Sequence, residues 1–104
     1  MIENVKIGNI VYKVEVTNNI SLGANYTGEI CYSDCIIRIR PQNPQKMLSD
    51  LFHEIFHGIY DFCGYGEHEE AVIDRFAHAL GLIVQDNPEL FTYAAETNNT
   101  NKKE

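Results

Sequence analysis

Two histidines and a glutamate in the segment LSDLFHEIFHGIYD, residues 48–61, have the types and spacing of a metal site with a base beside it. His53 and His57 are four residues apart, so on a helix both imidazoles lie on one face and can bind one tetrahedral metal ion. Glu54 directly follows His53 and reaches the same space from the flank. In this HExxH arrangement the carboxylate takes a proton from a water molecule that the metal makes acidic. The pattern predicts His53 and His57 as ligands and Glu54 as the catalytic base.

The alternative is that the two histidines share a helix face by chance. From average residue frequencies, a chain of this length contains HExxH accidentally on the order of a few times in a thousand. A second signal lies in EHEEAVIDRFAHAL, residues 67–80, where Glu70 and Asp74 are four apart and share a helical face. Taken alone, the acidic residues here fit a solvated helix N-terminus, where the macrodipole favours them.

The pair formed by Glu70 and Asp74 resembles the signature of gluzincins, in which a glutamate on a following helix completes the metal shell. An aspartate one turn later hydrogen-bonds a ligating histidine there. By that resemblance Glu70 is the third ligand and Asp74 holds a histidine, which we expect to be His53. The chemistry agrees, since a carboxylate finishes a His₂Glu site and a second carboxylate fixes the tautomer of an imidazole.

The chain also resembles the small zincin-like metallopeptidases encoded by phages and prophages, which are related to the ImmA/IrrE type. The resemblance runs from IIRIRP through the HExxH helix to DNPEL, although the EAN-x-FA run of that type is only partly echoed by residues 74–77. The metzincin pattern fails, because Tyr60 and Cys63 stand where it needs glycine and histidine. The resemblance implies a minimal zincin-like domain that uses Zn²⁺ to hydrolyse peptide bonds in a protein or peptide substrate.

The resemblance also implies how a peptide would bind, because in zincins an edge strand beside the metal pairs with extended substrate. The segment CIIRIR, directly before the HExxH helix, is the expected edge strand. Arg38 and Arg40 would then favour acidic or C-terminal groups in the cleft.

A structural zinc site in a regulatory or interaction module, or a catalytically weak one, is the rival hypothesis. Closed structural sites fill the fourth position with protein, and Cys63 and His78 are the nearby candidates. The ordinary role of a lone cysteine is that of a small hydrophobic side chain. His68 and His78 are expected to be surface or capping residues.

The first half of the chain predicts a small antiparallel sheet of three strands. In IVYKVEV, residues 10–16, apolar side chains alternate at period two, which is typical of a half-buried strand. YTGEICY, residues 26–32, and CIIRIR, residues 35–40, predict two further strands that form a hairpin through Ser33 and Asp34.

Helices follow the sheet, so the predicted class is α+β. Asn43 suits an N-cap, and apolar residues after Pro44 recur at intervals of three and four. The expected elements are an HExxH helix from Pro44 to about Phe62, a glutamate helix from about Glu67 to Val84, a short turn through Phe91 and a polar, disordered tail over residues 92–104. Residues 1–91 would then form a single domain.

Charge and composition narrow the partners. The net charge is −7, with most acidic residues in the second half of the chain, which disfavours nucleic acid because phosphate binding needs clustered Lys and Arg. The chain contains no apolar run of bilayer length and no basic leader, so we expect no membrane partner and a cytoplasmic location. Its three cysteines leave one unpaired, which favours reduced thiols.

Overall fold

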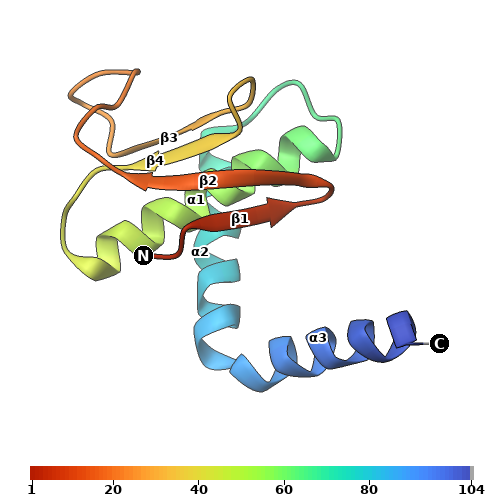
Figure 1. Ribbon diagram of the computed structural model, residues 1–104. Helices are drawn as coiled ribbons and strands as arrows, with labels where there is room; N and C mark the ends of the chain where they lie inside the picture. Colours follow the sequence, from red (N-terminus) through yellow and green to blue (C-terminus); the bar gives the residue numbers. More distant parts are fainter. Residues whose placement is uncertain (104) are drawn as a thin grey trace.

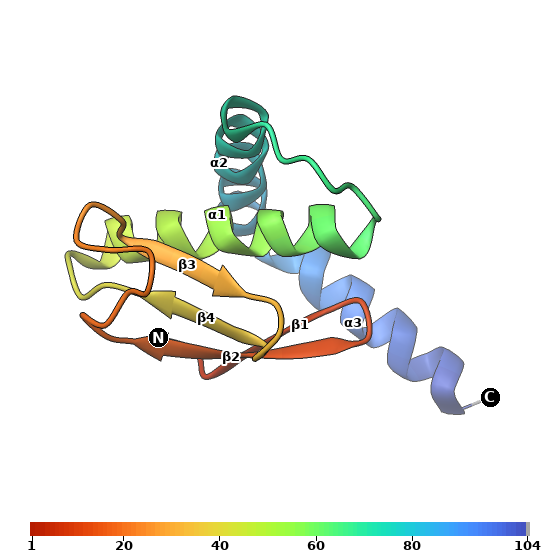
Figure 2. The same ribbon diagram turned by 90° about the horizontal axis from the view of Figure 1, so that it is seen from above.

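The computed structural model describes residues 1–103, with side chains described through Asn98. The class is α+β, as the sequence predicts (Figure 1). The strands are β1 (Asn4–Ile7), β2 (Ile10–Val16), β3 (Gly28–Cys31) and β4 (Ile36–Ile39), and the helices are α1 (Pro44–Phe62), α2 (Glu70–Asp86) and α3 (Pro88–Lys103). Helix α1 lies along one face of the sheet, and α2 crosses α1 on the side away from the strands (Figure 2).

The sheet is mixed and has four strands in the order β1-β2-β4-β3, so the prediction of a three-stranded antiparallel sheet was wrong. The predicted hairpin of β3 and β4 is present, but β2 pairs with β4 in parallel. Residues 17–27 cause this, because they carry the chain past the position of β4 to the far edge before it returns. The short strand β1, which pairs with β2 across the turn at Gly8, was not predicted.

The position of β4 corrects a functional expectation. CIIRIR supplies β4, which lies inside the sheet between β2 and β3, so it cannot be the edge strand beside the candidate metal site. That place belongs to β3. Arg38 pairs with Glu29 and Glu15, and the guanidinium of Arg40 donates hydrogen bonds to backbone carbonyls of residues 18, 23 and 26. These arginines hold the fold together and are not available to bind acidic substrate groups.

Helix α1 is positioned by its cap and by the core. The side chain of Asn43 accepts a hydrogen bond from the Lys46 N–H at 2.9 Å, as the predicted N-cap requires. One face of α1 then packs on the sheet. The core cluster consists of Ile7, Tyr12, Val14, Ile37, Ile39 and Leu51, with Met47, Ile55 and Ile59 packed against it. Because each such side chain stabilises the fold by about 1.5–3 kcal/mol when buried, the register of α1 is fixed and its opposite face is left for α2.

Helix α2 begins at Glu70, three residues later than predicted, and packs on α1 through the buried side chains of Ile73 and Ala77. Helix α3 runs from Pro88 to Lys103, where the sequence predicted a short turn and a disordered tail over residues 92–104. Its middle contains good helix formers such as Ala94 and Ala95, which the polar composition of the segment obscured. Residue 104 lies outside the described residues. No helix in the described part of the chain is long and apolar enough to cross a membrane.

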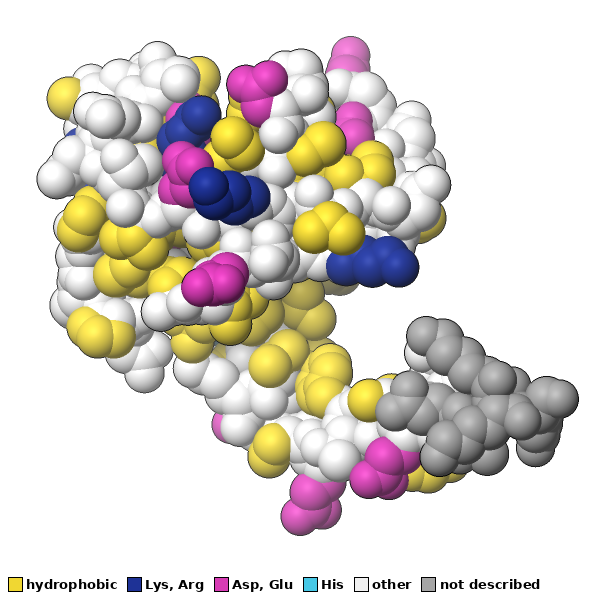
Figure 3. Space-filling model, in the orientation of Figure 1, with side chains coloured by type: hydrophobic (Ala, Val, Ile, Leu, Met, Phe, Trp, Pro, Cys, Tyr) yellow, Lys and Arg dark blue, Asp and Glu magenta, His cyan; other side chains and the backbone are white. Residues whose placement is uncertain are grey.

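A buried carboxylate ties the loop of residues 17–27 to the sheet. Glu29 is 5% exposed and accepts hydrogen bonds from the N–H groups of Ser21 and Leu22, both at 3.1 Å, and from Arg38 at 2.9 Å. Basic and acidic side chains lie side by side over the strands on the face seen in Figure 3. Among the ion pairs of the sheet, Glu15 pairs with Lys13 and with Arg38. Burial raises the pKa of Glu29, but the hydrogen bonds from Ser21, Arg38 and Leu22 outweigh this effect, and the pKa is lowered overall.

Glu29→Gln should therefore lower the free energy of unfolding at pH 7 by about 1.5–3 kcal/mol, because it weakens a buried charge-assisted network. A carboxyl group whose folded pKa is lowered contributes stability above its unfolded pKa and loses it as the pH falls through the folded value. The difference from wild type should accordingly shrink below about pH 4.5. Urea unfolding at several pH values measures this.

Glu15→Gln is the matched control, because Glu15 contacts the same arginine from a more exposed position. It should cost at most about 1 kcal/mol. A Glu29→Gln deficit that is the same at neutral and acidic pH would contradict the assignment.

Candidate metal centre

Four side chains meet where α2 crosses α1. His53 and His57 lie on the face of α1 opposite the sheet, and Glu70 and Asp74 lie on the first two turns of α2. Ile73 packs beneath the crossing and fixes the rotation of α2, so the residues before and after it are directed at α1. The structure thus brings together the four residues that the sequence selects as ligands and support.

The three candidate ligands have the mutual separations that one metal ion requires. The distance is 3.2 Å between the Nε2 atoms of His53 and His57, 3.1 Å from His53 Nε2 to Glu70 Oε2, and 3.0 Å from His57 Nε2 to Glu70 Oε1. Ligands of a tetrahedral zinc ion lie roughly 3.3 Å apart, because each zinc–ligand bond is about 2.0–2.1 Å long. A small outward shift of these atoms would seat such an ion.

Asp74 controls the proton of His53. Its Oδ1 lies 2.7 Å from His53 Nδ1, on the side of the ring away from Glu70. An ionised carboxylate only accepts hydrogen bonds, so Nδ1 carries the proton and Nε2 keeps its lone pair in the neutral ring. This is how an outer carboxylate prepares a histidine to bind a metal.

The surroundings of His57 favour its neutral form. Burial lowers the pKa of His57, and the nearby His53 and His68 lower it too, against the raising effect of Glu70. A neutral imidazole has the lone pair that a metal needs, so the environment of His57 favours the form that binds.

Glu54 occupies a buried position beside the ligands. It is 7% exposed and lines a cavity of about 420 Å³ together with His53, His57 and Glu70. Burial raises the pKa of Glu54 to about 8, and the negative charges of Glu70, Asp50 and Glu29 act in the same direction. The side chain can therefore hold a proton at neutral pH, as a residue that carries protons must.

The other wall of this cavity comes from the loop before β3 and from the start of β3 itself. Leu22, Tyr26 and Thr27 belong to the loop, and Gly28 begins the strand. A Cβ atom at residue 28 would lie 3.3 Å from Oε2 of Glu54, so the glycine lets the edge strand approach the carboxylate closely.

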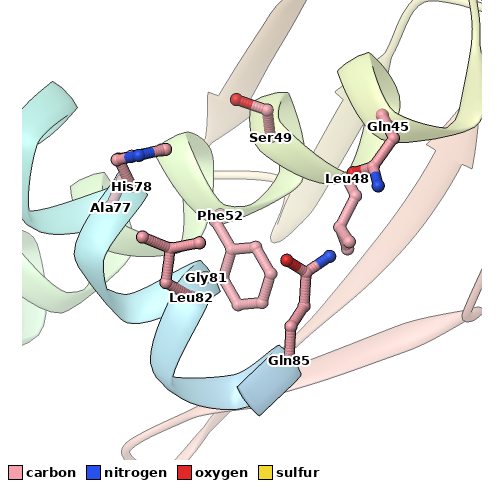
Figure 4. Close-up of a pocket in the computed structure, with 9 residues that line it drawn as sticks. All are labelled: Gln45, Leu48, Ser49, Phe52, Ala77, His78, Gly81, Leu82 and Gln85. Carbon is pink, nitrogen blue, oxygen red and sulfur yellow. The ribbon is translucent and has the colours of Figure 1, made fainter.

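Cys63 and His78, the candidates for a fourth protein ligand, do not join the site. Among the described His, Cys, Asp and Glu residues, His53, His57 and Glu70 are the group close enough to share an ion. Cys63 is exposed beyond the end of α1. His78 lines a separate cavity of about 370 Å³ between α1 and α2, beside Phe52 (Figure 4). A tetrahedral ion held by these three residues would have one position left for a non-protein ligand.

His68 is the member of the site that sequence reasoning missed. Its Nδ1 lies 2.7 Å from Nδ1 of His57, although the sequence suggested a surface or capping role. His68 belongs to neither helix, so no helical spacing could relate it to His57; only its place just before Glu70 hinted at the site.

Comparisons of this chain with protein-family models, curated proteins and solved structures find no match.

Replacing a candidate ligand should remove the metal. His57→Ala or Glu70→Ala should lower zinc content sharply, because a His₂Glu shell loses charge and geometry with either side chain. Glu69→Ala is the matched control, since Glu69 is the N-cap of α2, its side chain makes no capping hydrogen bond and it lies outside the ligand group. Metal analysis of the purified variants decides between the two acids. Loss of zinc in Glu69→Ala together with retention of zinc in Glu70→Ala would contradict the assignment.

Asp74→Asn should weaken zinc affinity by roughly 10 to 100-fold, because the amide keeps the shape of the side chain but not the charge that orients His53. Titration with a competing chelator measures the change. Asp86→Asn, at the exposed far end of the same helix, should leave the affinity at the wild-type value. Equal affinities for all three proteins would remove Asp74 from the site.

Proposed function

We propose that the chain is a zinc-dependent metallopeptidase of minimal zincin-like build that hydrolyses peptide bonds in a protein or peptide substrate. One observation carries the proposal: a three-ligand His₂Glu group lies beside a buried glutamate in an open cavity. Catalytic zinc sites have three protein ligands and an open position, whereas structural sites usually have four protein ligands.

The chemistry assigned to each residue follows from its place. A Zn²⁺ ion held by His53, His57 and Glu70 would supply positive charge that polarises a carbonyl group and makes water more acidic. Glu54 ionises at neutral pH once a nearby divalent charge offsets its burial, and it then takes a proton from the attacking water. As the C–N bond breaks, Glu54 returns that proton to the leaving amine.

The edge strand β3 offers the backbone groups that would hold an extended peptide. The Arg40 N–H donates to the Thr27 carbonyl at 2.8 Å, so these two residues form a hydrogen-bonded pair. In an antiparallel ladder, pairs of opposite residues are alternately hydrogen-bonded and not hydrogen-bonded. Residues 29 and 31 therefore face β4, and the backbone N–H and C=O groups of Gly28 and Ile30 face the free edge. A substrate strand paired there would run beside Glu54 and the ligands, which is recognition by strand addition.

The charge of the cavity disfavours acidic substrate groups, whereas the sequence predicted that Arg38 and Arg40 would favour them. Four carboxylates line it, and its described lining includes no Lys or Arg; the four are Asp50, Glu54, Glu70 and Asp74. Three of them serve the metal or the proton transfer, and Asp50 is paired with Lys46. Acidic substrate side chains beside the scissile bond would be repelled.

A zinc-binding regulatory or interaction module is the second candidate. The observation that favours it is a set of apolar side chains that α2 and α3 leave exposed, namely Leu82, Ile83, Leu90 and Phe91. Such a surface suits a protein partner. It concerns a different part of the molecule and gives no role to the buried Glu54.

Glu54→Gln separates these two functions. It should retain zinc at the wild-type level and abolish turnover, because the amide fills the same space but cannot accept the proton. The assay incubates zinc-loaded protein with a mixture of denatured proteins and detects new N-termini by mass spectrometry. Removal of zinc by a chelator should also stop cleavage, and added zinc should restore it.

Asp61→Asn is the control, since Asp61 is an exposed acid on the same helix outside the cavity. It should cleave as wild type does. Cleavage by Glu54→Gln at the wild-type rate would overturn the catalytic assignment, and a zinc-loaded wild type that cleaves nothing would favour the regulatory module.

A further inference from the structure

We propose that His68 is a positioning residue, which accepts the Nδ1 proton of His57 and thereby presents the Nε2 lone pair of His57 to the metal. The inference rests on the proposed zinc site and adds a residue from the loop between α1 and α2. The two Nδ1 atoms are 2.7 Å apart, a distance at which one ring must donate and the other accept.

The direction of this hydrogen bond follows from the contact that the other ring nitrogen of His68 makes. Its Nε2 lies 3.1 Å from the backbone carbonyl of Tyr65, and a carbonyl oxygen only accepts. Nε2 of His68 therefore carries a proton, and in the neutral ring this leaves a lone pair on its Nδ1. His57 must donate from Nδ1, and its Nε2, which faces Glu70 and His53, is left unprotonated.

The orientation of the rings supports this assignment. The planes of His57 and His68 differ by 16°, and the ring centroids are 5.0 Å apart. The lone pair of an imidazole nitrogen lies in the plane of its ring, so nearly parallel planes with touching nitrogens suit an in-plane N–H···N bond. Face-to-face packing would place other ring atoms closest.

His68 is held in place by its surroundings. The ring of Tyr60 packs edge-on against it, with centroids 5.3 Å apart and planes at 65°. Between Asp61 and Ala71, His68 is the one residue that is half-buried and not exposed. The loop turns at Gly64, whose φ of +86° favours glycine, and Tyr65 then donates its N–H to the Tyr60 carbonyl at 3.0 Å. This turn presents the Tyr65 carbonyl to His68.

Each of the two ligating histidines thus has an acceptor for its Nδ1 proton, but the two acceptors are different groups. A carboxylate on α2 accepts from Nδ1 of His53, and a neutral imidazole from the loop accepts from Nδ1 of His57. A neutral acceptor orients the ring but adds no charge. We therefore expect its loss to weaken zinc binding by about 10-fold, at the lower end of the usual range for outer partners of metal ligands.

A spectroscopic measurement detects the bond directly. In ¹⁵N-labelled, zinc-loaded wild-type protein, a coupling between the Nδ1 nuclei of His57 and His68 should be transmitted across the hydrogen bond. The proton should be attached to Nδ1 of His57. Absence of the coupling, or a proton attached to Nδ1 of His68, would overturn the proposal whatever the affinities are.

Matched variants separate positioning from packing. His68→Ala should bind zinc about 10-fold more weakly than wild type in a chelator competition, and His68→Asn should recover most of that loss. Asparagine recovers it because its Oδ1 lies near the place of the imidazole Nδ1 and accepts in its stead. His78→Ala, in the separate cavity between α1 and α2, should behave as wild type.

The outcomes also distinguish this inference from the proposed function. A wild type that binds zinc and cleaves protein, together with unchanged affinity in His68→Ala, overturns the role of His68 alone. Equal weakening in His68→Ala and His68→Asn assigns His68 to packing and overturns it too. A wild type that binds no zinc overturns the proposed function and the inference together.

Discussion

The convergence of two imidazole nitrogens and one carboxylate at the crossing of α1 and α2 is the constraint on which the site depends. These atoms lie 3.0–3.2 Å apart, and on the far sides of the two rings Asp74 contacts Nδ1 of His53 and His68 contacts Nδ1 of His57. Lone pairs and negative charge gathered this closely repel unless a proton or a cation lies between them. A shared proton or a bound cation would remove that repulsion, and the buried Ile73 side chain keeps α2 in the rotation that brings these groups together.

Two parts of the fold, the sheet and the loop of residues 17–27, position the helix crossing and the cavity beside it. The sheet anchors one face of α1 through the core, so that the HExxH face is turned to α2 and the cavity. Glu29 and Arg40 then tie the loop of residues 17–27 to the sheet, so the cavity has a firm second wall. Glu54 lies between these two parts, buried enough to hold a proton and close to an edge strand that is free to pair.

Local chemistry determined which parts of this structure could be predicted. The N-cap at Asn43, the helix that follows and the β3–β4 hairpin depend on neighbouring residues, and the sequence predicts them. The spacing of four residues also placed Glu70 and Asp74 on one face of α2, although α2 begins three residues later than predicted. The parallel pairing of β2 with β4 depends on the path of a long loop, which no local pattern fixes. For the same reason β3, and not CIIRIR, became the edge strand.

His68 shows the same limit within the site. Its contact with His57 requires the turn at Gly64, the hydrogen bond from Tyr65 to Tyr60 and the packing of the Tyr60 ring, none of which a spacing rule contains. Helix α3 is a different case, because weak helix formers and polar residues dominate its second half and the sequence favours a tail there.

Anomalous diffraction at the zinc edge, from crystals of the zinc-loaded protein, locates the ion and its ligands. We expect one zinc ion about 2.0–2.2 Å from Nε2 of His53, Nε2 of His57 and the carboxylate of Glu70, with a non-protein ligand in the fourth position. A zinc ion bound elsewhere, or one whose fourth ligand is Cys63 or His78, would contradict this assignment.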